Sequence, residues 1–381
     1  MTVRPEKKAY KDTEPLSENS SPRKHRGIFR LLLEEGGPGF CQFAITNVCN
    51  ARCGFCGFAT DKMPHEGRKY VSPESALKAI DILFDHGVRY LEIDGGEPLL
   101  HPDLEIIVRR ASSLKMNVLL VTNGSLLVEK TIDRLADAGV TGFIISIDAA
   151  TARQHEANRG LPGVCQRIRE ANRLISTLKL SSTASTTMSR LVDYDSLPDF
   201  LESLNFRSVT FSYPLTGLRS NYLGFAQSHM IDFDTEELLE TLEKVKRLKK
   251  RFPVVNPTPS LEEMKRFLRN EEQRYPCLAG YKYFYLDWNL DLWRCYNWKE
   301  PMCSVLEFDG SQRIRDGCTE CMIDCFRDAS VLHHIGISLG DAFQTLRSGR
   351  PDKALKALFR RGNLGSIRAL LEDLRWLTHV Y

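Results

Sequence analysis

The sequence predicts an α/β protein, a partial (β/α)6 TIM-like barrel that is followed by a small Cys-rich extension and a helical tail. Short, nearly continuous apolar runs alternate with longer segments in which apolar residues recur at helical spacing. This alternation is typical of a parallel sheet covered by helices. Six strand–helix units joined by right-handed crossovers predict a sheet that curls without closing.

The elements can be placed in order along the chain. A short helix is expected over residues 28–33 and the first strand over residues 40–45. Ser72 at the N-cap, followed by Pro73, begins a helix that ends near Gly87. Further strands and helices alternate over residues 90–93, 104–114, 117–121, 128–138, 142–147, 164–178, 181–188, 197–204 and 208–213. The charged segment 235–251 is expected to form a long helix.

Composition divides the chain into four parts. Residues 1–27 are rich in Pro, Ser, Lys and Glu and almost free of aliphatic residues, which predicts a disordered or loosely docked arm. We expect the barrel over residues 28–255, the Cys-rich region over 256–335 and a basic helical tail over 336–381.

Charge and hydropathy exclude several classes of protein. Both ends of the chain are basic and its middle is slightly acidic, so the formal net charge of +3 gives no continuous basic face. A nucleic-acid partner is therefore not expected. No long apolar run and no signal peptide are present, which predicts a cytoplasmic protein without a membrane span. The 11 cysteines of such a chain are metal ligands or buried thiols rather than disulfides.

The first group of candidate metal ligands follows the first strand. Cys49, Cys53 and Cys56 stand at C-x3-C-x2-C spacing. Fe–S cubes are normally held by four cysteine thiolates, so three in one loop leave one iron open to a small molecule. The alternatives are a zinc site or reduced structural thiols, although zinc sites usually show two close pairs of ligands.

Polar residues follow the next strands, at the edge of a parallel barrel where reactive groups gather. They are Gly95, Gly96 and Glu97 after the second strand, Asn123 after the third, and Ser146 and Asp148 after the fourth. Two glycines allow close approach of a ligand, and they are equally suited to a plain turn. The short polar residues could instead cap helices. Arg159, in the loop HEANRG, could pair with a carboxylate or remain solvated, and Thr186 is a candidate pocket residue.

A second cysteine group lies near the end of the chain. It comprises Cys277, Cys295, Cys303, Cys318, Cys321 and Cys325. We expect four ligands, Cys277, Cys295, Cys318 and Cys321, with Cys325 as the replacement if one of them is wrong. Zinc is the alternative, because C-x2-C suits it equally well. Cys41 and Cys165 stand alone and are predicted to be buried hydrophobes.

Two further segments allow two interpretations each. Aromatic residues crowd the second cysteine group and form either a substrate pocket or a hairpin core; they are Tyr281, Tyr283, Tyr285, Trp288, Trp293, Tyr296 and Trp298. In the tail, Pro351 is near a helix start, and Leu355, Leu358 and Phe359 form one apolar face among basic residues. A basic amphipathic helix can bind a membrane surface or a partner. The plainer expectation is that these helices close the open barrel.

The cysteine triad, with Phe55 before its third member, resembles the signature of the radical S-adenosylmethionine (radical SAM) superfamily. The run from Asp94 to Pro98 is similar to the family's GGEP motif. The later cysteines resemble the twitch or SPASM extension, which binds an auxiliary [4Fe–4S] cluster. One departure is Leu290, which stands where that extension usually has glycine.

The resemblance implies a set of cofactors and roles. A [4Fe–4S] cluster on the triad would bind S-adenosylmethionine through its amino and carboxylate groups, and a flavodoxin- or ferredoxin-type reductase would supply electrons. Phe55 would shield the cluster, and Gly95, Gly96 and Glu97 would contact the methionyl ammonium. Asn123, Ser146 and Asp148 would meet the ribose, and Arg159 the methionine carboxylate.

The predicted function is an enzyme that removes a hydrogen atom from an unactivated carbon of a small biosynthetic intermediate, such as a sugar or a lipid. A peptide maturase is the alternative, but the 39 residues before the first strand are too few and too polar for the usual peptide-recognition domain. A non-catalytic Fe–S electron carrier is a further alternative, which would need no methionine-binding motif. No residue can be named as catalytic from the sequence.

Overall fold

The computed structural model describes residues 27–214, 216–226 and 228–380. Of the arm expected over residues 1–27, all but Gly27 lies outside them. Within the described residues, the strands form one sheet in the order β6-β5-β4-β3-β2-β1-β7-β8-β9. They are β1 (Gly39–Thr46), β2 (Val88–Gly95), β3 (Asn117–Thr122), β4 (Gly142–Ser146), β5 (Ser181–Thr187), β6 (Val209–Ser212), β7 (Tyr283–Leu286), β8 (Asp291–Trp293) and β9 (Cys303–Ser304).

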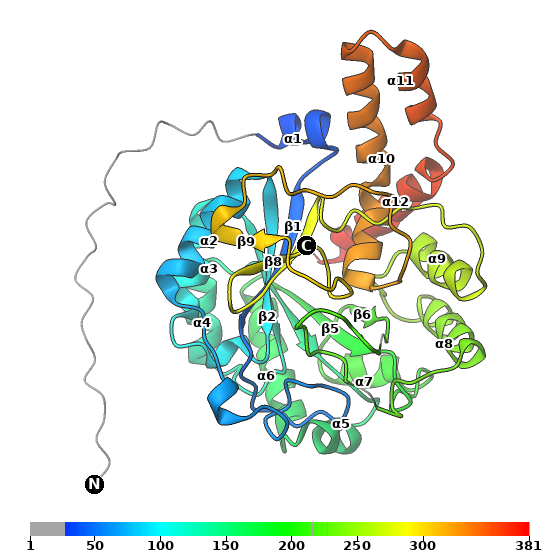
Figure 1. Ribbon diagram of the computed structural model, residues 1–381. Helices are drawn as coiled ribbons and strands as arrows, with labels where there is room; N and C mark the ends of the chain where they lie inside the picture. Colours follow the sequence, from blue (N-terminus) through cyan, green and yellow to red (C-terminus); the bar gives the residue numbers. More distant parts are fainter. Residues whose placement is uncertain (1–26, 215, 227, 381) are drawn as a thin grey trace.

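Helices cover the outer side of this sheet, as Figure 1 shows. Their bounds are α1 (Ile28–Glu35), α2 (Pro73–Asp85), α3 (Leu104–Ser113), α4 (Glu129–Ala138), α5 (Ala152–Arg159), α6 (Val164–Thr177), α7 (Leu197–Ser203), α8 (Thr235–Leu248), α9 (Thr258–Leu268), α10 (Asp324–Arg347), α11 (Pro351–Leu358) and α12 (Asn363–Val380). Strands β1 to β6 pair in parallel and in sequence order, which confirms the α/β partial barrel.

Local signals fix the ends of several helices. Ser72 accepts a hydrogen bond from the backbone N–H of Ser75 at 3.2 Å, and Pro73 is the first residue of α2, as the sequence indicated. Asp234 and Glu237 form a capping box at the start of α8. That helix was expected to reach residue 251 and ends at Leu248. Such short-range hydrogen bonds satisfy the N–H groups that a helix start leaves without partners.

The two faces of the barrel sheet differ in exposure. The side chains that face the helices are at most 1% exposed, as in Leu91, Ile93 and Leu120. Those that alternate with them on the inner face are half-buried, as in Glu92, Leu119 and Val121. Successive side chains of a strand point to opposite faces. The outer face therefore forms the core, while the inner face opens to solvent.

The Cys-rich region extends the barrel sheet at its first strand. β7 pairs in parallel with β1, and β8 and β9 continue the sheet in antiparallel order. The turn between β7 and β8 contains Leu290 with a φ of +67°. A non-glycine residue in this left-handed region costs on the order of 1–3 kcal/mol. This backbone conformation would suit a glycine, the residue expected at position 290 from the resemblance described above.

Three helices, α5, α9 and α10, were not predicted. The 24-residue α10 passes through the expected boundary between residues 335 and 336, so the tail does not begin there as a separate unit. Its first half joins β6 to β7. Asp324 Oδ1 accepts from the backbone N–H of Tyr213 at 2.9 Å, and the Tyr283 hydroxyl donates to the Ala329 carbonyl at 2.8 Å.

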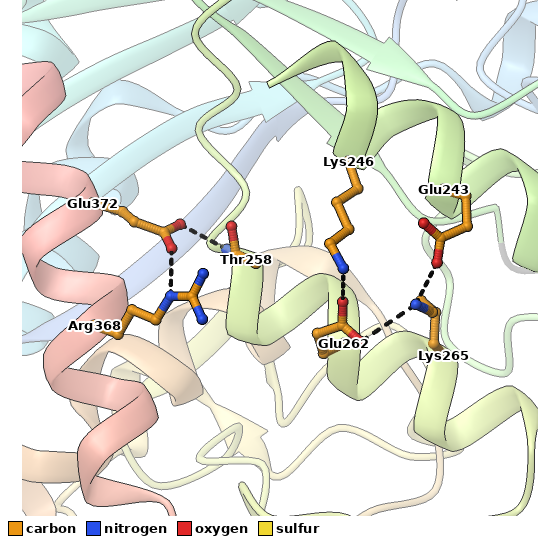
Figure 2. Close-up of polar contacts among 7 residues, drawn as sticks. All are labelled: Glu243, Lys246, Thr258, Glu262, Lys265, Arg368 and Glu372. Carbon is orange, nitrogen blue, oxygen red and sulfur yellow. Dashed lines mark hydrogen bonds and ion pairs between the residues drawn. The ribbon is translucent and has the colours of Figure 1, made fainter. Parts of the chain in front are cut away.

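The last helix is attached to the barrel by the polar contacts drawn in Figure 2. Glu372 of α12 accepts a hydrogen bond from the backbone N–H of Thr258 at 2.9 Å and pairs with Arg368 at 3.3 Å. Lys265 of α9 pairs with Glu243 of α8. These contacts hold α8, α9 and α12 together.

The apolar side chains of α11 do not close the barrel. Leu355, Leu358 and Phe359 are 58%, 41% and 78% exposed, so the expectation that they are buried is wrong. The physical reason is the packing of α11 on α10, which uses the small residues Ala354 and Ala357 and leaves the larger ones outside. None of the helices in the described ranges has the apolar length that a bilayer crossing requires.

Candidate functional site

The cysteine loop follows β1 at the carboxyl end of the parallel strands. Asn47 fixes its start, because Nδ2 donates to the Gly67 carbonyl at 2.8 Å and Oδ1 accepts from the backbone N–H of Lys69 at 2.7 Å. Lys62 lies over the loop, with Nζ 3.0 Å from the carbonyl of Gly54. The chain is thereby folded tightly around the three cysteines.

The three thiols are shielded from water. Cys53 is 6% exposed, and Cys49 and Cys56 are half-buried. Burial raises the pKa of Cys49 and the pKa of Cys53 to about 12. Such thiols ionise when a metal binds, because metal ligation favours the thiolate. Three clustered thiols of this kind fit an Fe–S cube that is held through three of its irons.

Gly95 and Gly96 lie where β2 meets the cysteine loop. The backbone N–H of Gly96 donates to the Thr46 carbonyl at 2.9 Å, and that of Glu97 donates to the Val48 carbonyl at 2.8 Å. A Cβ atom on Gly96 would lie 2.2 Å from the Val48 carbonyl oxygen, and Gly95 has a φ of +120°. Both glycines are therefore required by this close approach of two backbones.

Glu97 ties the ends of β2 and β3 together. Its fully buried carboxylate accepts hydrogen bonds from the Thr122 hydroxyl and from the backbone N–H of Asn123, each at 2.7 Å. Burial raises the pKa of Glu97 to about 7 in spite of these bonds. Asn123 Nδ2 donates to Asn50 Oδ1 at 2.8 Å and lies 3.9 Å from Cys49 Sγ. The end of β3 thus faces the triad.

Asp148 and Arg159 form a buried ion pair. Arg159 Nη2 donates to Asp148 Oδ1 at 2.7 Å, and Asn158 Nδ2 donates to Asp148 Oδ2 at 2.8 Å. Burial opposes ionisation, yet the charge of Arg159 lowers the pKa of Asp148 overall. The expected loop position of Arg159 is wrong, since it is the last residue of α5. Its carbonyl accepts from the backbone N–H of Arg52 at 2.8 Å, beside the cysteine loop.

Arg159 keeps one donor for a ligand. Its Nε is buried and has no hydrogen-bond partner among the described residues. Buried donors are nearly always satisfied in native proteins. An anionic ligand group placed between α5 and the triad would satisfy this one, so the residue present here fits the predicted carboxylate.

The other candidate residues lie at different positions. Ser146 is half-buried at the end of β4, on the inner face. Phe55 is 5% exposed, and its carbonyl accepts from the backbone N–H of Ala226 at 2.7 Å. Thr186 shares the face of Ala184, which packs in the core on the helix side. Thr186 therefore lies on the outer face of the sheet, although it was predicted as a candidate pocket residue.

A backbone hydrogen bond and electrostatic interactions link the four expected ligands of the second group. The backbone N–H of Cys277 donates to the Cys318 carbonyl at 2.8 Å. Burial, with smaller effects of Cys277 and Cys318, raises the pKa of Cys321 to about 11. Burial and then Cys321 raise the pKa of Cys295. These four thiols thus lie within electrostatic range of one another.

The remaining cysteines of this group face elsewhere. Burial and the charges of Asp324 and Glu92 raise the pKa of Cys325, which places it at the inner wall of the barrel. Cys303 lies on β9, and burial and then Glu307 raise its pKa. Within the described ranges, no three His, Cys, Asp or Glu side chains converge as they would around one metal ion. The ligand assignments therefore remain predictions from spacing and placement.

Buried cations lie beside the second cysteine group. Arg294 is 1% exposed and makes a two-pronged ion pair with Asp316 at 2.6 and 2.7 Å. Arg327 is 2% exposed, and its Nη1 donates to the Cys318 carbonyl at 3.4 Å. Positive charge next to thiolates favours their ionised form.

Aromatic rings connect the two cysteine groups. Tyr222 stacks on Tyr296 with ring centroids 3.7 Å apart, and its edge meets Phe58 at 5.8 Å. Of the aromatics that were predicted to build either a pocket or a hairpin core, four are buried in one cluster: Tyr283, Tyr285, Trp293 and Tyr296. The structure supports the hairpin core for these four.

Sequence reasoning missed several supporting residues. Lys62, Asn158 and Tyr222 reach the site through the fold, and no spacing in the chain indicates them. Arg294 could have been found, because it precedes Cys295 directly and basic residues near a cysteine favour its thiolate.

Comparisons with known proteins find similarity over part of the chain. Residues 43–206 match the model of the Radical SAM superfamily. The chain is 31% identical over 161 residues to the AdoMet-dependent heme synthase of Methanosarcina barkeri, covering 42% of this chain and 45% of that protein. It is 28% identical over 172 residues to the GTP 3′,8-cyclase of Chlorobaculum tepidum, covering 45% of this chain and 51% of that protein. The chain thus spans about half the length of these curated relatives.

A solved structure resembles most of the chain. The crystal structure of Streptococcus suis SuiB bound to precursor peptide SuiA gives a TM-score of 0.55 at 16% sequence identity. The similarity covers 90% of this chain and 82% of that one. At this identity the likeness concerns the fold.

Proposed function

We infer that this chain, which carries a radical SAM domain over residues 43–206, is an enzyme that cleaves S-adenosylmethionine reductively. The radical so produced would remove a hydrogen atom from an unactivated carbon of the substrate. The observation that carries the proposal is the meeting of the cysteine triad with Asn123 and with the Asp148–Arg159 pair at one end of the barrel. Barrel enzymes place their chemistry at this end of the strands.

Different residues of the site would hold different parts of the cofactors. Cys49, Cys53 and Cys56 would each bind one iron of a [4Fe–4S] cube. When bound, that cube and S-adenosylmethionine would supply one electron and a 5′-deoxyadenosyl radical. Arg159 would orient the methionine carboxylate through its unpartnered Nε. Asp148 would keep the guanidinium in place, since it fixes the other side of the group.

The strand ends would position the rest of the cofactor. We propose that the backbone at Gly95 and Gly96 meets the methionyl ammonium and that Asn123 and Ser146 meet the ribose. Glu97 would position the ends of β2 and β3 rather than contact the cofactor, because its carboxylate already accepts hydrogen bonds from the Thr122 hydroxyl and the backbone N–H of Asn123. Phe55, buried within the loop, would shield the cluster from water.

The second cysteine group would hold one auxiliary [4Fe–4S] cluster. The buried guanidinium of Arg294 lies within electrostatic range of Cys318 and Cys295 and would offset part of the negative charge of their thiolates. Tyr222 and Tyr296 fill the space between this group and the triad. We propose that a flavodoxin- or ferredoxin-type reductase supplies the electrons and that a reducing compartment such as the cytoplasm preserves both clusters.

The substrate is proposed to be a small biosynthetic intermediate. The inner face of the barrel is partly exposed and carries hydroxyl groups from Ser185, Thr187, Thr210 and Ser212. Such a wall suits a polar small molecule better than an apolar one. The structural neighbour bound to a precursor peptide shares the fold alone, so a peptide substrate remains the alternative. Metabolites that accumulate when the enzyme is deleted would separate the two.

Reductive cleavage separates the enzyme from a mere electron carrier. Anaerobic protein with both cysteine groups loaded with iron is given S-adenosylmethionine and dithionite, and 5′-deoxyadenosine is measured. We expect it to form, because the triad leaves one iron open for the ligand. An electron carrier would give none.

A membrane surface is the partner that we propose for the tail. Most of the large hydrophobic side chains that the described residues expose lie on α1, α10, α11 and α12. Figure 1 shows α10 and α11 projecting from the barrel. Contiguous apolar surfaces of this kind mark sites of protein or membrane binding.

The positive charge of residues 347–361 favours an anionic membrane as the partner of the tail. Residues 347–361 contain six Lys or Arg and one Asp. Arg350, Lys353, Lys356 and Arg360 line a hollow of about 710 Å³ between α10 and α11, in which Asp341 pairs with Arg360 at 2.7 Å. The exposed Leu355 and Phe359 belong to the same helix and its end. A basic hollow beside exposed apolar residues fits a phosphate headgroup above acyl chains, and each such cation contributes about 1 kcal/mol at an anionic surface.

Vesicle flotation tests this partner. The protein is expected to float with vesicles of phosphatidylcholine and phosphatidylglycerol and to be released by salt. Replacing Leu355 and Phe359 together by Ser should weaken flotation, as should Lys353→Glu with Lys356→Glu. Ile106→Ser with Val128→Ser, at residues 45% and 47% exposed on the barrel, is the matched control. Equal binding to neutral vesicles, or no binding to either, would reject the proposal.

A further inference from the structure

Two acidic side chains project from neighbouring positions on the inner wall of the barrel. Glu92 and Asp94 alternate with the outward-facing Leu91 and Ile93 on β2. Gln42 of β1 lies opposite Glu92 in the sheet, and its Nε2 donates to Glu92 Oε1 at 2.6 Å. This is the only hydrogen bond of the Glu92 side chain among the described residues.

The Asp94 carboxylate has no hydrogen-bond or ion-pair partner among the described residues. It is 6% exposed, and its Oδ1 is buried without a hydrogen bond in the part of the chain that the structure describes. The Tyr285 hydroxyl, on the inner face of β7, is likewise buried and unpartnered. Buried polar atoms are normally paired, and a buried carboxylate is normally paired with a cation. The wall therefore lacks a group that would satisfy these atoms.

The described strands of the barrel supply no such cation. Within the described strands β1 to β7, Arg89 is the only basic residue, and its guanidinium donates to the carbonyls of Phe84 and Val88. Burial and then Glu92 raise the pKa of Asp94, and no basic group opposes this. Asp324 and Tyr222, which also lie within electrostatic range, are acidic or neutral. Among the described residues no basic group offsets the two carboxylates, which leaves a place for a cationic ligand group.

We propose that Glu92 and Asp94 form a subsite for the protonated amine of the substrate. The substrate is then an amine-bearing polar molecule, whose hydroxyl groups can meet the Ser and Thr side chains of β5 and β6. This inference rests on the proposed function, because it takes the inner face of the barrel as the substrate space. A GTP substrate, as the name of one relative prints, carries a triphosphate that the acidic wall would repel.

The charge of the wall can be measured without the substrate. Leu119 lies on the inner face of β3 directly opposite Glu92, about 4.8 Å away in the sheet. In the holoprotein with Leu119→Cys, we would compare the reaction rates of the new thiol with two methanethiosulfonate reagents, one carrying trimethylammonium and one carrying sulfonate. Mass spectrometry of the peptide that contains position 119 separates this thiol from the native cysteines.

The cationic reagent is expected to react about tenfold faster, after correction for its rate with a free thiol, because a cleft with charge of one sign concentrates the opposite ion. Adding Glu92→Gln and Asp94→Asn, which keep the size of the side chains, should remove the preference while the iron content stays unchanged. A preference for the anionic reagent, or one that survives in the neutral variant, would overturn the subsite.

Neither reductant nor S-adenosylmethionine is present in this measurement. A protein that lacks the preference and still forms 5′-deoxyadenosine would reject the amine subsite alone. A protein that shows the preference and forms no 5′-deoxyadenosine would reject the proposed function and leave the subsite standing.

Discussion

Replacing Cys49, Cys53 and Cys56 together by alanine is expected to reduce 5′-deoxyadenosine formation to the level of a protein-free control. The three thiols lie on one loop, and Cys49 Sγ lies 3.9 Å from Asn123 Nδ2 at the end of β3. Without them no cube can be held where Arg159 and Asn123 converge. The measurement is the amount of 5′-deoxyadenosine formed anaerobically with dithionite, by chromatography and mass spectrometry.

The matched control is Cys165→Ala. Cys165 lies on α6, is 4% exposed and packs in the core, so its removal tests the loss of a buried thiol without touching the loop. This variant should retain 5′-deoxyadenosine formation. Activity that survives in the triple variant would show that the cleavage takes place elsewhere.

Iron content should fall by half in the same triple variant. Two cubes hold about eight irons in the wild-type protein and one cube about four. Replacing Cys277, Cys295, Cys318 and Cys321 together should cause the complementary loss and leave about four irons on the triad. Iron, zinc and protein are measured on the same anaerobic sample.

The single variants Cys303→Ala and Cys325→Ala provide the comparison within this region. Cys303 lies on β9 and Cys325 faces the inner wall, so neither should change the iron content if the four-cysteine assignment is right. About four irons and one zinc in the wild-type protein would instead assign the second group to a zinc site.

Much of the barrel follows from local patterns in the sequence. The apolar strands and the signal at Ser72 depend on neighbouring residues, and these elements are found within a few residues of their predicted bounds. The spacing of the cysteine triad is equally local. Its meeting with the strand ends follows from the rule that parallel strands end at one edge of a barrel.

The rest depends on contacts between distant segments. The pairing of β7 with β1 joins residues more than two hundred positions apart, and no pattern in either strand indicates it. The role of Glu97 as a tie between β2 and β3 appears only once Thr122 and Asn123 are placed. In the tail, helical spacing predicted an apolar face correctly, but spacing alone does not show that Ala354 and Ala357 make the contact and leave Leu355 exposed.

Electron–nuclear double resonance on the reduced wild-type protein tests the central claim most directly. S-adenosylmethionine isotopically labelled in its amino and carboxylate groups is added to the protein, and the hyperfine coupling of the labelled nuclei to the cluster is recorded. Direct coupling of both labels is predicted, because a cube on Cys49, Cys53 and Cys56 leaves one iron without a protein ligand. A paramagnetic cluster at the triad that shows no coupling to either label would contradict the account.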